Sequence, residues 1–350
     1  MMGKKGQRAE SKERRAKGKE QEEEKKPYPP CSTHGVSPVD LRKVRTYPLR
    51  ERKNKVKVSD FASPAAAGRS VRDLLEGLPR ILVGDDLRQL VSAIGSAYAR
   101  TKPVIAMMGG HVIKCGLSPV IISMMDRGIL TGIAMNGAAS IHDFEIALIG
   151  ETSEDVGTNI ATGKFGMWEE TGRLMNQAVK AGRNEHEGMG IALGRKLVEL
   201  KAPHLDASVL AAAFRLNMPV TVHVAVGTDI IHQHPEADGA ALGDASFTDF
   251  RIFVSEVSNL GYGGVLLNLG SAVIMPEVFL KALSIARNLG HDVVDFTAAD
   301  FDMIQHYRPR ENVIRRPTNM GGRGYAITGH HEIMIPLLAH AVMDQIGQGN

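Results

Sequence analysis

One stretch decides the fold of this chain, residues 103–151: PVIAMMGGHVIKCGLSPVIISMMDRGILTGIAMNGAASIHDFEIALIGE. It begins with a short apolar run, residues 104–108, which has the length and character of a buried strand. Two glycines follow, then a helical pattern, and then a second apolar run at residues 129–135. That run ends in a small-residue turn at 136–139, and a second helix comes after it. The order strand, turn, helix, strand, turn, helix predicts two successive βα units.

The small residues stand where each predicted strand passes into its helix. Such junctions leave unpaired backbone N–H groups at a helix N-terminus, which favours an anion such as a pyrophosphate. The first turn reads GGHVIKCG rather than G-x-G-x-x-G, and paired glycines also serve plain tight packing. Both interpretations, nucleotide binding and packing, therefore remain open at this point.

The alternation continues to the end of the chain. A third small-residue junction, Gly270-Ser271-Ala272, follows the apolar run 264–269 and precedes a helix with Pro276 in its first turn. This pattern predicts an α/β fold: a Rossmann-like, doubly wound, mostly parallel sheet with helices on both faces. Further strands are expected at 220–226, 292–296 and 325–328, and further helices at 85–99, 165–181, 187–200, 206–216 and 332–346. The segment from Asp300 to Gly322 is expected to be irregular.

Charge divides the chain into two parts. Residues 1–58 hold 18 lysines and arginines against 8 acidic residues, about +10, which leaves about −7 on the remainder of a chain whose total is +3. The first residues are nearly free of apolar side chains, so we expect a basic, disordered tail at 1–47 and a single Rossmann-like domain at 48–350. The tail is either a solubilising extension or an arm that makes weak, salt-sensitive contact with nucleic acid.

Two cysteines, Cys31 and Cys115, do not form a disulfide framework or a zinc motif. No apolar run reaches the length of a membrane span, and the N-terminus has no apolar signal core. These features predict a cytoplasmic protein without membrane contact.

The most polar segment follows the predicted strand at 220–226 and reads GTDIIHQHPEADGAALGDASFTD. A loop this charged after a buried strand usually carries function. His232 and His234 are spaced so that they could share a metal, but two histidines alone are a weak metal signal, and we predict no metal site. General acid/base chemistry or recognition of an amine by carboxylates fits the segment better. Its candidate catalytic residues are His232, His234, Asp238 and Asp244, to which we add His142 from the helix after the second junction.

Four runs together resemble the deoxyhypusine synthase family, and most closely its bacterial and archaeal deoxyhypusine synthase-like branch. They are NGAASIHDFEIAL, DGAALGD, GSAVIMPEVFLKAL and EIMIPLLAHAV, in the family's order, and the similarity covers about residues 55–343. The resemblance implies a Rossmann-like homotetramer that binds NAD near subunit interfaces. In that family spermidine is oxidised by hydride transfer to NAD, and its aminobutyl group passes through an imine on an enzyme lysine to a lysine of a translation initiation factor.

The resemblance also implies a site, residue by residue. Asp238 and Asp244 match the aspartates of the family's DG-x-LGD run, of which the second faces the polyamine. The implied cofactor residues are Gly109, Gly110 and His111 in the first loop, Asn136, Gly137 and Ala138 in the second with Asp143 after them, and Gly270 and Ser271 in the third.

One departure from the family pattern concerns the chemistry. The family's imine-forming lysine lies in a tryptophan–glycine–lysine run before the last strand, where this chain reads RRPTNMGGRGYAI. No lysine follows Lys281, and the single tryptophan is Trp168. Arg323 cannot replace the lysine, because a guanidinium stays protonated and is no nucleophile for an imine.

These observations predict a deoxyhypusine synthase-like transferase: NAD-dependent dehydrogenation of a spermidine-type amine, with aminoalkyl transfer that does not use the lysine. Two alternatives remain, a non-catalytic or sensing NAD-binding homologue and a metal-assisted hydrolase using His232 and His234. All depend on geometry. The corners at 109–110, 136–139 and 270–272 should lie side by side along one sheet edge, with the histidine-rich segment opposite.

Overall fold

The structure, a computed structural model, describes residues 39–64 and 70–347. Contacts divide the chain into two units, Met1–Lys55 and Val56–Asn350. Most of the tail expected at 1–47 lies outside the described residues. The described part of the first unit, residues 39–55, contains two short 3₁₀ turns, η1 (Leu41–Lys43) and η2 (Leu49–Glu51), and buries none of its side chains.

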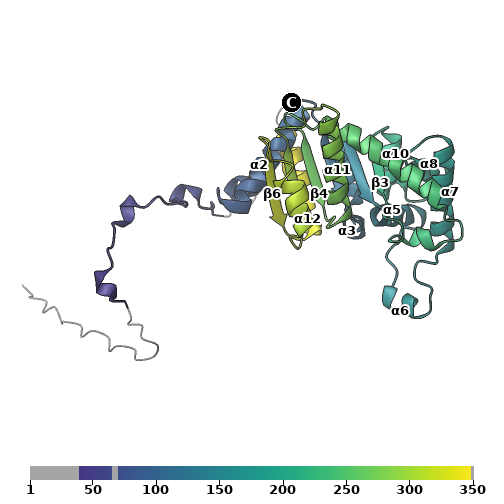
Figure 1. The fold of residues 1–350 in the computed structure, drawn as a ribbon, viewed down its shortest axis with the longest axis horizontal. Helices are drawn as coiled ribbons and strands as arrows, with labels where there is room; N and C mark the ends of the chain where they lie inside the picture. The colour runs from purple at the N-terminus through teal and green to yellow at the C-terminus, as the bar shows by residue number, and fades with distance from the viewer. Residues whose placement is uncertain (1–38, 65–69, 348–350) are drawn as a thin grey trace, which may run out of the picture. The chain divides into compact units, whose positions relative to one another are not determined.

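The second unit is built on a parallel sheet of six strands in the order β3-β2-β1-β4-β5-β6 (Figure 1). The first strand of the chain is therefore central, and the strand order reverses between β1 and β4. This confirms the predicted doubly wound, parallel α/β fold. The strands are β1 (Val104–Met108), β2 (Gly132–Asn136), β3 (Val220–His223), β4 (Val265–Leu269), β5 (Thr297–Asp302) and β6 (Arg323–Thr328).

The register of the three middle strands positions the site. Met108, the last residue of β1, pairs with Met135 of β2 and with Leu269 of β4. Because parallel strands that end level deliver their following loops to one edge, the three small-residue corners lie side by side there. This is the arrangement that the sequence predicted.

Helices cover both faces of the sheet. On one face α2 and α13 pack together and join a large apolar core; on the other, α10 and α11 close a smaller core around Phe253, Phe279 and Phe296. Among the described residues, no helix combines the length and apolar character needed to cross a membrane. The longer helices are α1 (Val71–Gly77), α2 (Leu82–Ala99), α4 (Ser118–Asp126), α5 (Gly137–Ile149), α7 (Glu169–Asn184), α8 (Met189–Glu199), α9 (Val209–Arg215), α10 (Gly239–Ser258), α11 (Ile274–Asn288) and α13 (His331–Ile346).

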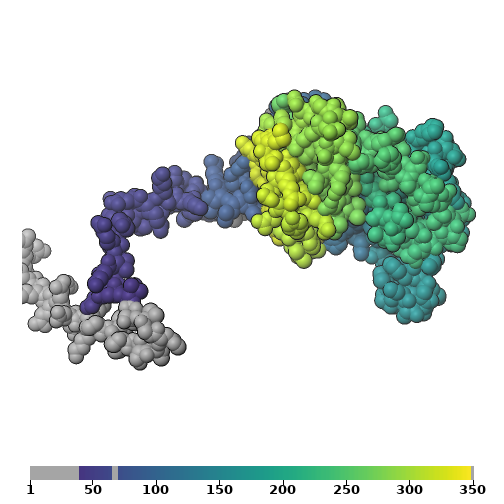
Figure 2. Space-filling view, in the orientation of Figure 1, coloured from purple at the N-terminus to yellow at the C-terminus, as the bar shows by residue number. Residues whose placement is uncertain are grey.

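Short elements complete the unit. Figures 1 and 2 show the residues around α6 standing out from the body as a separate lobe, at the same edge as α3 and α5. We call residues 151–168, which contain α6, the arm. The short elements are α3 (Gly110–Lys114), α6 (Val156–Ala161), α12 (Tyr307–Pro309), η3 (Val58–Asp60), η4 (Leu205–Ala207), η5 (Ile230–Gln233) and η6 (Arg310–Arg315), the last a π-helical turn.

Three expectations about local structure were wrong. No strand forms at 292–296, and the strand in this region, β5, begins at Thr297 instead. Asp295 has a left-handed backbone (φ 48°), which a β-strand cannot include. Asp300 therefore belongs to a strand rather than to an irregular segment. The helix expected from Asp206 is a 3₁₀ turn followed by α9, which Ser208 caps through Ala211 N.

Candidate functional site

The first and third corners touch through their backbones. Gly109 N donates to the carbonyl oxygen of Leu269 at 3.0 Å, and a Cβ on Gly109 would collide with the carbonyl of Gly270. Gly270 has φ 67°, and a Cβ there would lie 2.5 Å from His331 Nε2. Tight packing thus accounts for these two glycines by itself, as one of the two sequence interpretations anticipated.

Polar groups are buried beside this contact without full hydrogen bonding. Asn268 Nδ2 donates to Asp300 Oδ1 at 2.7 Å and to Ser271 O at 3.0 Å. Burial raises the pKa of Asp300 to about 6. Asn268 Oδ1, Asp300 Oδ2 and His331 Nδ1 have no partner among the described residues, and the His331 ring lies 5.7 Å from that of His111. Unpartnered buried polar atoms at the point of strand reversal fit a polar ligand such as a dinucleotide.

The second corner has a different neighbour. Asn136 caps α5 by accepting from Ala139 N at 2.9 Å, as its place at the end of a strand suggests. A Cβ on Gly137 would collide with the carboxylate of Asp229, which therefore lies directly over the start of α5. The favourable position for an anion at this helix N-terminus is thus taken by a side chain of the protein itself.

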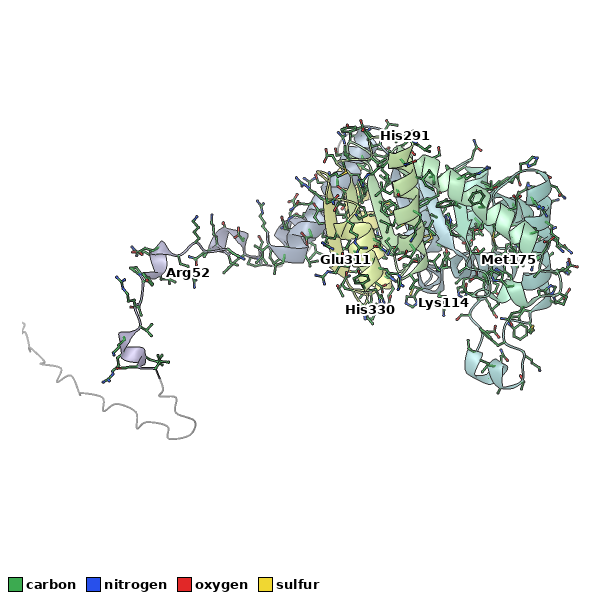
Figure 3. All side chains as sticks on the ribbon, in the orientation of Figure 1. Arg52, Lys114, Met175, His291, Glu311 and His330 are labelled. Atoms are coloured by element: carbon green, nitrogen blue, oxygen red, sulfur yellow. The ribbon has the colours of Figure 1, made fainter. Side chains whose placement is uncertain are left out.

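A cavity of about 750 Å³ opens next to Asp229, between α5, α7 and the arm. Five carboxylates line it but only one lysine, Lys114, which Figure 3 places at the same edge of the unit as His330. Phe165 and Trp168 form an aromatic part of the wall. The carboxylates are Glu145, Glu151, Glu154, Glu170 and Asp229. An acidic cavity with aromatic walls suits a cationic ligand with an aliphatic body.

His142 also lines the cavity and is held by a chain of hydrogen bonds. Its Nδ1 lies 2.7 Å from Thr152 Oγ1, whose hydroxyl donates to Glu145 Oε2 at 2.5 Å; Thr171 donates to the other oxygen of Glu145 at 3.1 Å. Burial, reinforced by Lys114, lowers the pKa of His142 to about 4. The imidazole is consequently neutral at neutral pH.

Asp143 lies away from the cavity. Its carboxylate is fully buried and accepts hydrogen bonds from Ser208 Oγ at 2.6 Å, Val209 N at 2.7 Å and Leu210 N at 3.1 Å. It therefore satisfies the first N–H groups of α9 and ties that helix to α5. Burial raises its pKa to about 6 in spite of these hydrogen bonds.

His232 and His234 have separate partners. His232 Nδ1 accepts from Gly227 N at 3.1 Å and its Nε2 faces Asp229 Oδ2 at 4.0 Å; His234 Nε2 lies 3.2 Å from Glu169 Oε2. Within residues 39–64 and 70–347, no three His, Cys, Asp or Glu side chains are arranged to hold a metal ion. The two imidazoles thus support local packing and do not form a shared site.

Asp238 and Asp244 do not line the cavity. Asp238 caps α10 by accepting from Ala240 N at 2.9 Å and Ala241 N at 3.1 Å. Asp244 is exposed on α10, 3.9 Å from Arg183. Of the predicted catalytic candidates, the structure brings only His142 into the cavity.

Sequence pattern does not single out Glu145, Thr152 and Asp229 as a group, because Asp229 lies far along the chain from the other two. The one available signal was the position of Asp229 in the turn after a buried strand, where ligands of α/β proteins usually bind. Trp168 offered no signal, since it stands at the start of a helix with an ordinary amphipathic pattern.

No protein-family model matches this chain, and no curated protein matches it. Among solved structures it is similar to a protein assigned as LOR/SDH from Methanococcus maripaludis S2, with 14% identity and a TM-score of 0.47 over 80% of this chain and 71% of the other. AgrE, solved with ornithine and NAD+, has 12% identity and a TM-score of 0.48, over 76% of this chain and 33% of the AgrE chain. A protein assigned as deoxyhypusine synthase from Entamoeba histolytica has 9% identity and a TM-score of 0.45, over 80% of this chain and 94% of the other. The chain spans a third of the length of AgrE.

Proposed function

We propose that this protein binds NAD at the carboxyl edge of its sheet and dehydrogenates an aliphatic amine of the spermidine type. One observation carries the proposal: the acidic cavity opens beside the second small-residue corner, at the same sheet edge as the two corners that flank the reversal of strand order. Dinucleotides bind at such a reversal in doubly wound sheets. The ammonium group of an amine, which only donates hydrogen bonds, suits a cavity lined by carboxylates.

The residues proposed to hold the dinucleotide are those of the first and third corners, Gly109, Gly110, His111, Gly270 and Ser271, next to the unpartnered polar atoms of β4 and β5. When bound, NAD supplies the hydride acceptor. Asn136, Gly137 and Ala138 adjoin the amine side of the site instead, because Asp229 covers Gly137. Loss of a hydride to NAD and of the N–H proton turns the amine into an imine. A second amine or water then attacks the imine carbon, and the original C–N bond breaks with release of the first amine, without a lysine intermediate. We also propose that the protein forms a homotetramer, which analytical ultracentrifugation would test.

The test is NAD binding by calorimetry, followed by absorbance of reduced nicotinamide across a panel of polyamines. His111→Ala should weaken NAD binding, whereas His291→Ala should not, since both histidines are exposed but His291 lies at the opposite edge (Figure 3). Absence of NAD binding in the wild-type protein would end the proposal.

A second candidate function is an NAD-binding sensor without turnover. The absence of any lysine after Lys281 favours this candidate, because the imine step of the deoxyhypusine synthase family needs a lysine in that region. Its signature is stabilisation of the fold by NAD together with no reduction of NAD by any amine in the panel.

A further inference from the structure

We propose that the cavity between α5, α7 and the arm binds the ammonium end of an aliphatic amine, with the Asp229 carboxylate as counter-ion and His142 Nε2 as a second acceptor. This places amine recognition outside the segment from His232 to Asp244, where the sequence led us to expect it. The inference rests on the amine half of the proposed function and does not require NAD.

Asp229 is the first reason. It is 8% exposed, and its Oδ2 has no hydrogen-bond partner among the described residues, although the side chain lines the cavity. Burial raises its pKa to about 6, against a smaller lowering by the Thr228 hydroxyl, so the carboxylate is largely ionised at neutral pH. A buried charged oxygen left without a donor is costly, and a cation in the adjoining cavity would offset the charge of the carboxylate.

His232, which lies beside Asp229, does not satisfy its free oxygen. His232 Nε2 is 4.0 Å from Asp229 Oδ2, which is too far for a hydrogen bond, and this nitrogen is itself unpartnered. Burial lowers the pKa of His232, so it carries no charge that would neutralise the carboxylate at neutral pH. Among the described residues no side chain neutralises Asp229, and a cationic ligand would supply the missing charge.

His142 is the second reason, because its tautomer is fixed. The Thr152 hydroxyl has one proton and donates it to Glu145, so it can only accept from His142 Nδ1. Nδ1 then carries the ring proton and Nε2 presents a lone pair. No described residue contacts that nitrogen with a hydrogen bond. The Asp229 carboxylate and His142 Nε2 are thus both acceptors among the residues that line the cavity, which favours a ligand that donates hydrogen bonds.

The walls indicate what the ammonium is attached to. Trp168 and Phe165 offer aromatic faces to a cation or to methylene groups, while Glu151 and Glu170 are exposed lining residues. We expect a second ammonium on the same ligand to interact with these carboxylates. The cavity therefore fits an aliphatic diamine better than a monoamine, and a monoamine better than an uncharged diol of equal length.

The experiment is calorimetric titration of the full chain, without NAD, with diaminobutane, butylamine and butanediol. The expected order of affinity is diamine, monoamine, diol. Asp229→Asn should weaken diamine binding by about tenfold to a hundredfold, because it removes a charged acceptor while keeping the shape. Asp244→Asn is the matched control and should leave binding unchanged. Equal binding of diol and diamine, or a loss with Asp244→Asn but not with Asp229→Asn, would overturn the inference.

A second pair of variants protects against misfolding of Asp229→Asn. Trp168→Leu should reduce diamine affinity several-fold, whereas Phe247→Leu, which changes another exposed aromatic residue outside the cavity, should not. If both variants bind like wild type, the site is wrong. Diamine binding without NAD binding would uphold this inference and refute the dehydrogenase. NAD binding without diamine binding would refute this inference and favour the NAD-binding sensor over the dehydrogenase.

Discussion

Gly109 and Gly270 meet backbone to backbone, so that no side chain separates the loops that follow β1 and β4. Each loop therefore limits the position of the other, and the two corners behave as one rigid piece at the sheet edge.

The first prediction tests this contact. Gly109→Ala should lower the free energy of unfolding by about 1–3 kcal/mol, because its Cβ would collide with a carbonyl that has little room to move. Gly243→Ala is the control: it lies inside α10 with open space around it, and should raise stability by up to about 1 kcal/mol. Urea unfolding measures both. Equal effects in the two variants would show that the corner is not tightly packed.

The second prediction concerns the buried cap of α9. Asp143→Ala should cost at least about 3 kcal/mol of unfolding free energy, because three donors lose their acceptor inside the protein. Asp155→Ala removes the cap of the exposed helix α6 and should cost about 1 kcal/mol or less. If Asp143→Ala instead kept wild-type stability and lost NAD affinity, the cofactor role expected from the sequence would be the correct one.

The third prediction is a pH dependence. The carboxylate of Asp249 is buried and accepts from Gly190 N at 2.9 Å and Val222 N at 2.7 Å, and burial raises its pKa to about 8 from the usual 3.8. As the pH rises, Asp249 loses its proton in the unfolded chain before it does so in the folded protein. The protonated group therefore contributes its full stability below about pH 4, and this contribution is lost as the pH rises through 8.

The wild-type protein should therefore lose stability between about pH 4 and pH 8, and Asp249→Asn should not show this loss. The measurement is the difference in unfolding free energy between the two proteins, taken at several pH values across this window. A difference that does not change with pH would mean that the Asp249 carboxylate ionises normally.

The fourth prediction concerns the arm. Glu154 accepts from Gly166 N at 2.9 Å and from Asn159 Nδ2 at 2.8 Å, and so joins the two ends of the lobe. Glu154→Ala should speed amide hydrogen exchange in residues 155–166 by about tenfold without changing the global unfolding midpoint. Glu151→Ala, an exposed residue at the same cavity, should leave exchange unchanged. If exchange in Glu154→Ala were unchanged, contacts other than those of Glu154 would hold the arm in its structure.

The sequence predicted the sheet well where apolar periodicity was strong. β1 was predicted to the residue, because five buried apolar side chains stand directly before two glycines. β5 was misplaced because Thr297–Asp302 carries aspartates at two buried positions, which an apolar pattern cannot reveal. The order of the strands follows from tertiary packing and was not readable from any local pattern.

The candidate site was harder to predict, for a physical reason. His232, His234 and Asp238 are polar residues close together in the chain, yet each is used by the backbone around it. Glu145, Thr152 and Asp229 line one cavity because α5, the arm and the loop after β3 all border it. Chemistry assembled across segments leaves little trace in a single sequence.

The central place of β1 has a consequence for how the polypeptide is made. Its β4 neighbour is translated only after β2, β3 and the intervening helices, so half of the sheet can form on the ribosome while β1 still has an open edge. Such an edge invites pairing with other nascent chains. Covering the open edge of β1 until β4 has emerged would therefore protect the nascent chain from such pairing.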